Sequence, residues 1–149
     1  MKYEFIVIDP DTTKLKYKEK EFTIVKDVAL MMELQNINFT AKTRLMSDLT
    51  KAGKTVDDFI VKEIKDGKRY ENTSNIRRLE YDYVLQVSYE VLEKISKKYT
   101  KMGLEELLKD VGINEEKEAA AFWSKIKKAI FGTSTPSGKE QQDSNMFAV

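Results

Sequence analysis

The feature that most constrains the fold of this chain is a long periodic run of apolar residues just past its midpoint. These residues recur every three or four positions: Ile76, Leu79, Tyr83, Val87, Val91, Ile95 and Tyr99. Such spacing matches the period of an α-helix and places these side chains on one helical face. The sequence therefore predicts a helix of about 25 residues, with this stripe as the spine of a hydrophobic core.

The N-terminal part of the chain follows a different pattern, which is typical of β-strands. Tyr3 to Asp9 is rich in aromatic and β-branched residues, and Pro10 to Thr12 supplies turn residues before a second run, Leu15 to Lys26. This order predicts a β-hairpin. Because the apolar residues change parity within the second run, that run is either one strand with a bulge near residues 18–21 or two shorter strands.

Three short helices are predicted between the hairpin and the long helix. Each begins at a potential capping residue: Asp27, Thr40 and Thr55. Each ends at residues that favour turns: Asn36 to Asn38, Gly53 and Gly67. The polar segment that follows, Lys68 to Asn75, is predicted to be a loop.

Two more helices are predicted after the long helix. Gly103 and Gly112 bracket the first of them, and Asn114 caps the second, which ends at Gly132. We therefore expect an α+β fold, mostly α-helical, with an N-terminal β-hairpin followed by about six helices. With 149 residues, of which 41% are hydrophobic, the chain is long enough for one core. Residues 1–132 should form a single globular domain, and the polar residues 133–149 a flexible C-terminal tail.

The composition argues against most enzyme mechanisms. The chain has no His and no Cys, which removes the usual general base, thiol nucleophiles and common zinc ligands. Neighbouring carboxylates such as Asp57 and Asp58 would point about 100° apart on a helix, and turn chemistry explains Asp9 and Asp11. We therefore expect no catalytic residue, no metal site and no cofactor. An enzyme with a carboxylate-bound metal is the least favoured class of function.

A DNA-binding protein is the alternative to a protein-binding one. Ala41 to Lys51 and Val56 to Lys65 have the spacing of a helix-turn-helix. The second helix would open with Asp57 and Asp58, which phosphates repel, and the formal net charge of +1 gives no general attraction to nucleic acid. Ordinary helix packing is thus favoured, and a small helix-turn-helix DNA-binding or regulatory protein remains the alternative.

The closing helix carries four large apolar residues on one face: Phe122, Trp123, Ile126 and Ile130. In one interpretation this face docks on the long helix and closes the core. In the other the helix binds a partner, with the apolar end of the chain as a second contact. The candidate partner-binding residues are Trp123, Lys127, Met146, Phe147 and Val149.

The order of these segments resembles that of the tail assembly chaperones of long-tailed bacteriophages that infect Gram-positive hosts. A β-hairpin leads through KEFTIVKDVALMMELQ into compact helices, and a long helix, LEELLKDVG and a polar extension follow. The resemblance spans residues 2–132. It implies a non-enzymatic protein that coats the tape-measure protein and recruits tail-tube subunits, often with a longer frameshifted form.

The expected partners are therefore other proteins, including phage tail components, and further copies of the chain. No apolar stretch approaches the roughly 20 residues needed to cross a bilayer, and the apolar run at the N-terminus is too short for a signal peptide. We expect no membrane partner and a cytoplasmic location, in the host cell if the protein is phage-encoded.

Overall fold

The fold is α+β and mostly helical, as the sequence predicts. The computed structural model describes residues 2–132, in which five α-helices, one 3₁₀ helix and five strands in two sheets are present. The chain divides into two compact units. Among the described residues, unit 1 comprises residues 2–35 and 91–132, and unit 2 comprises residues 36–90. The single domain stays a prediction, and the predicted tail lies outside the described residues.

Unit 1 begins with a three-stranded antiparallel sheet. The strands β1 (Glu4–Asp9), β2 (Thr12–Tyr17) and β3 (Lys20–Val25) pair in chain order. The predicted hairpin is therefore the first part of a meander, and its second run forms two shorter strands. The chain reverses next to Lys18, whose φ is 52°, so a turn and not a bulge causes the change of parity.

The helices of unit 1 are α1 (Val28–Gln35), the C-terminal part of α3 (Ser74–Thr100), α4 (Leu104–Val111) and α5 (Glu116–Phe131). Asp27 caps α1 as predicted, because its Oδ1 accepts a hydrogen bond from the Leu30 backbone N–H at 3.0 Å. Gly112 ends α4 in the left-handed conformation that glycine favours. The predicted cap of α5 is wrong by one residue: Glu115, and not Asn114, occupies the N-cap.

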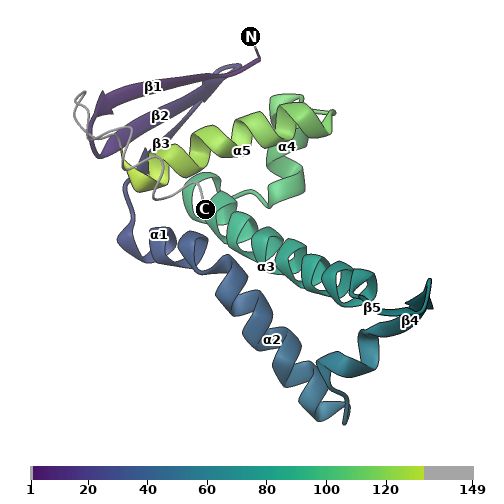
Figure 1. The fold of residues 1–149 in the computed structure, drawn as a ribbon. Helices are drawn as coiled ribbons and strands as arrows, with labels where there is room; N and C mark the ends of the chain where they lie inside the picture. The colour runs from purple at the N-terminus through teal and green to yellow at the C-terminus, as the bar shows by residue number, and fades with distance from the viewer. Residues whose placement is uncertain (1, 133–149) are drawn as a thin grey trace, which may run out of the picture. The chain divides into compact units, whose positions relative to one another are not determined.

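The apolar face of α5 is buried in unit 1, which confirms that it closes a core. Within unit 1, α5 contacts β3 and α1 (Figure 1), and docking of this face on the long helix stays a prediction. The centroid of the Phe122 ring lies 5.0 Å from that of the Tyr3 ring and 5.7 Å from that of the Phe5 ring. A sheet with one apolar face needs a covering layer, and periodicity within α5 cannot tell which layer it covers.

Unit 2 consists of α2 (Ile37–Lys51), the 3₁₀ helix η1 (Val56–Phe59), strands β4 (Val61–Lys65) and β5 (Lys68–Asn72), and the N-terminal part of α3. The long helix is confirmed, since α3 spans 27 residues and buries Val87. Leu45, Leu49 and Ile76 form a buried cluster between α2 and α3. Half-buried side chains pack around this cluster: Val56, Phe59, Ile60, Leu79 and Tyr83.

Three predictions in unit 2 are wrong. The second short helix begins at Ile37 and not at Thr40, so only Asn36 separates α1 from α2. The third is a single 3₁₀ turn followed by a strand, although its predicted capping arrangement is present: the Thr55 backbone N–H donates to Asp58 Oδ2 at 2.8 Å. The predicted loop contains β5.

The β4–β5 hairpin forms because of its turn. Asp66 and Gly67 both have positive φ, of 51° and 76°. Two such residues make the tight turn whose twist matches that of paired strands, and Asp-Gly is a preferred sequence for it. The β-branched residues Val61 and Ile64 favour a strand over a helix on the preceding side.

Candidate protein-binding surfaces

The charged side chains form ion pairs within each unit instead of a reactive cluster. Residues 2–132 contain no group of three or more acidic side chains placed to hold a metal ion. In unit 1, Asp27 pairs with Lys98. Asp110 accepts hydrogen bonds from Lys20 Nζ at 2.6 Å and from the Tyr17 hydroxyl at 2.8 Å. These carboxylates tie helices to one another and to the sheet.

The pKa shifts follow from the same contacts. The hydrogen bond from Lys98 lowers the pKa of Asp27, and those from Lys20 and then Tyr17 lower the pKa of Asp110. Burial, together with the bond to Asp110, raises the pKa of the Tyr17 hydroxyl. Each group keeps its ordinary charge at neutral pH, which is typical of structural pairs and not of a general acid or base.

The sequence-predicted binding residues are not brought together in the described part of the chain. Trp123 is only 6% exposed, and its ring lies 5.2 Å from that of Phe122, so it belongs to the core of unit 1. Lys127 is half-buried on the same helix. The remaining three lie outside the described residues: Met146, Phe147 and Val149. A binding role for all five residues stays a prediction.

The helix-turn-helix of the DNA-binding alternative, around Gly53, is absent from unit 2. Its first segment corresponds to part of α2, but the would-be recognition helix, Val56 to Lys65, forms η1 and β4. The predicted motif therefore lacks the element that would enter the major groove.

Large apolar side chains are exposed mainly in unit 2. Among the described residues thirteen such side chains are exposed, and eight of these lie in unit 2 although it is the smaller unit. The eight are Phe39, Met46, Val61, Ile64, Tyr70, Tyr81, Leu85 and Tyr89. Single exposed apolar residues are normal, whereas grouped ones mark interaction surfaces, so the five that lie on α2 and α3 are informative.

A groove with a volume of about 230 Å³ lies between α2 and α3. Its lining residues are Asn38, Ala41, Lys42, Leu45, Glu80 and Val84. Ala41 and Leu45 are buried and apolar, whereas Lys42 is an exposed cation. Phe39 and Met46 are three and four residues from Lys42, so they lie next to Lys42 at the rim of the groove, and neither lines it. Phe39 is 72% exposed there.

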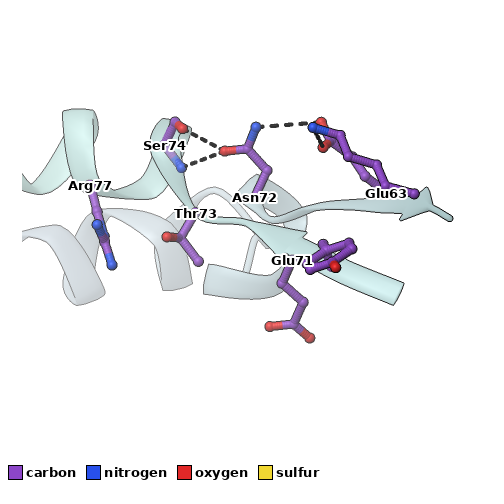
Figure 2. Close-up of a pocket in the computed structure, with 8 residues that line it drawn as sticks. Glu63, Glu71, Asn72, Thr73, Ser74 and Arg77 are labelled. Carbon is purple, nitrogen blue, oxygen red and sulfur yellow. Dashed lines mark hydrogen bonds and ion pairs between the residues drawn. The ribbon is translucent and has the colours of Figure 1, made fainter. Parts of the chain in front are cut away.

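Figure 2 shows a second cavity, of about 410 Å³, between the hairpin and the start of α3. The side-chain carbonyl of Asn72 accepts hydrogen bonds from the backbone N–H of Ser74, at 2.9 Å, and from its hydroxyl. The Asn72 amide also donates to Glu63 Oε1 at 3.5 Å. These bonds hold the first turn of α3 to the hairpin, and we interpret them as architectural.

Comparisons with known proteins identify no family and no relative that would indicate a role for these surfaces. No protein-family model, no curated protein and no solved structure matches the chain. Within residues 2–132, none of the helices combines the length and apolar character needed to cross a membrane.

The groove could not be predicted from the buried row of α2, Ala41, Leu45 and Leu49, because this row indicates only one packed face. A second signal was available. Phe39 and Met46 are seven residues apart, two helical turns, and they lie about 100–160° around the helix from Ala41 and Leu45, off the buried row. Apolar residues on both sides of a short helix indicate a second contact surface.

Proposed function

We propose that this chain is a non-enzymatic protein-binding factor in macromolecular assembly, and that the groove between α2 and α3 receives a helical segment of its partner. The observation that carries this proposal is the position of Phe39. It is 72% exposed and lies one helical turn from Lys42, which lines the groove together with Ala41 and Leu45. Aromatic residues that become buried next to such grooves often contribute most of the binding free energy at protein interfaces.

A helix is the partner segment that this groove fits best. Two packed helices leave a furrow between them, and an amphipathic helix fills such a furrow with apolar residues spaced three or four apart. Lys42 and Glu80 line the groove with opposite charges. Charges beside the apolar stripe of an incoming helix would pair with them, which would fix its direction.

A more specific proposal follows from the resemblance to tail assembly chaperones. In this proposal the partners are the tape-measure protein and the tail-tube subunits of a long-tailed phage. The arrangement of strands, compact helices and one long helix over residues 2–132 is compatible with it. The DNA-binding alternative is not favoured by any surface described above.

The test is isothermal titration calorimetry of the full chain against the tape-measure and tail-tube proteins encoded in the same genome. We expect the parent to bind, and Phe39→Glu to weaken binding about 30-fold, which corresponds to the loss of about 2 kcal/mol at an interface hot spot. Ser47→Glu is the matched control, because it places the same exposed charge on the side of α2 away from the groove. It should bind like the parent.

The two levels of the proposal fail separately. If neither protein binds the parent chain, tail assembly is the wrong setting. If one binds and Phe39→Glu binds equally well, the groove is the wrong surface.

A further inference from the structure

Helix α3 has a second apolar stripe on the side away from the core of unit 2. Tyr81, Leu85 and Tyr89 are 62%, 50% and 45% exposed. They are spaced four residues apart, so they lie along one face of the helix. The buried residues Ile76 and Val87 lie on the opposite face. The stripe is separate from the groove next to Phe39, because it faces away from α2.

The spacing of this stripe is symmetric about its middle residue. Tyr81 precedes Leu85 by four residues, and Tyr89 follows it by four. A two-fold interface is self-complementary, and two antiparallel copies of such a stripe match residue for residue. Leu85 would pack on Leu85 at the axis, and Tyr81 on Tyr89 on either side.

We propose that two copies of this chain pair through this stripe, with their α3 helices antiparallel and the two-fold axis passing at Leu85. The proposal goes beyond the groove, since it assigns a different surface and a different occupant.

The charges beside the stripe are compatible with this pairing. Arg78 and Asp82 lie one turn apart on the same side of α3, so the positive and negative charges of the stripe offset each other. In the antiparallel register Asp82 of one copy lies next to the Tyr89 ring of the second copy and not next to a second carboxylate. The whole chain has a formal net charge of only +1, so long-range repulsion between copies is small.

The exposed area predicts a weak and reversible dimer. A tyrosine side chain buries about 150–250 Å² when covered, so the exposed parts of Tyr81 and Tyr89 offer roughly 300–550 Å² for the pair of copies. With Leu85 and the flanking polar residues, the interface stays below the 1,200 Å² or more of standard stable complexes. We therefore expect a dissociation constant on the order of micromolar, with dimer and monomer in concentration-dependent exchange.

Single-cysteine variants give a direct test, because the chain has no cysteine of its own. At a two-fold axis between packed helices the two Leu85 Cα atoms come within the range of about 4.4–6.8 Å that a disulfide needs. Mild oxidation of Leu85→Cys should therefore give a covalent dimer rapidly. Gln86→Cys is the matched control, since its side chain is exposed but points about 100° away around the helix. A mixture of Tyr81→Cys and Tyr89→Cys should form mixed dimers faster than either variant forms dimers alone.

Sedimentation equilibrium of the full chain provides the second readout. The parent should show a monomer–dimer equilibrium, and Leu85→Glu should weaken it at least tenfold while its circular dichroism and melting temperature stay at the parent values. Equal cross-linking of Leu85→Cys and Gln86→Cys would overturn the proposal. So would a parent that stays monomeric at several hundred micromolar, or a dimer that Leu85→Glu leaves unchanged.

Discussion

Replacing Phe122 by Ala is expected to destabilise unit 1 by about 3–5 kcal/mol. The side chain is 0% exposed, and its ring contacts three other rings at centroid distances of 5.0, 5.7 and 5.2 Å: those of Tyr3, Phe5 and Trp123. Burying a phenylalanine removes about 150–250 Å² from water, which corresponds to roughly 4–6 kcal/mol as an upper estimate. Alanine would lose most of this stabilisation and leave a cavity among rings that cannot easily collapse.

The assay is urea unfolding followed by tryptophan fluorescence. Trp123 is the only tryptophan of the chain and contacts Phe122 directly, so its emission reports the unfolding of unit 1. Phe39→Ala is the matched control, because it makes the same substitution at a residue that is 72% exposed. Followed by circular dichroism, it should change the free energy of unfolding by less than about 0.5 kcal/mol.

A small effect at Phe122 would refute this reasoning. If Phe122→Ala unfolds within about 1 kcal/mol of the parent, α5 is not packed on the sheet as described. If Phe39→Ala is as destabilising as Phe122→Ala, then Phe39 is buried in solution. The proposal that Phe39 and the groove bind a partner would then also be wrong.

Three further predictions concern single positions. Val87→Asp should abolish the cooperative melt seen by circular dichroism, because it places an unpaired charge at a site that is 4% exposed; a transition near the parent temperature would contradict this. Asp27→Ala should cost about 1 kcal/mol in urea unfolding through loss of its cap on Leu30. Because the hydrogen bond from Lys98 lowers the pKa of Asp27, this stabilisation is complete above the unfolded-state pKa of about 3.9 and is lost as pH falls through the folded-state value. The difference between parent and Asp27→Ala should thus shrink from pH 7 to about pH 2, and a constant difference would count against the assignment. Gly112→Ala should lower the melting temperature by the equivalent of about 1–2 kcal/mol, since φ is 94° there, and an unchanged melt would show that the turn adjusts.

The elements that could best be predicted from the sequence are those in which the same apolar spacing repeats over many helical turns. Seven periodic residues between Ile76 and Tyr99 specify α3 over its whole length, whichever layer the helix covers. The segment from Val56 to Ile64 was ambiguous, because three or four apolar residues fit a helix and a strand about equally well. The Asp66-Gly67 turn favours the strand, because its two residues with positive φ join paired strands.

The candidate surfaces were harder to predict than the elements. A groove between two helices depends on how both are rotated, and the sequence of α2 alone shows only that Phe39 lies off its buried row. Trp123 shows the reverse case. Its position at the edge of an apolar helical face suggested an interface, but the side chain is only 6% exposed and its ring contacts that of Phe122.

The two-stranded sheet β4–β5 also determines where the chain opens first. Each of its strands has a neighbour on one side only, so every second backbone amide points away from the ladder toward solvent. In hydrogen–deuterium exchange these amides should be labelled well before those in the middle of α3. The turn at Asp66 and Gly67 is then the natural site for a first proteolytic cut in unit 2, and a place where a short affinity tag could be inserted without disturbing either helix face.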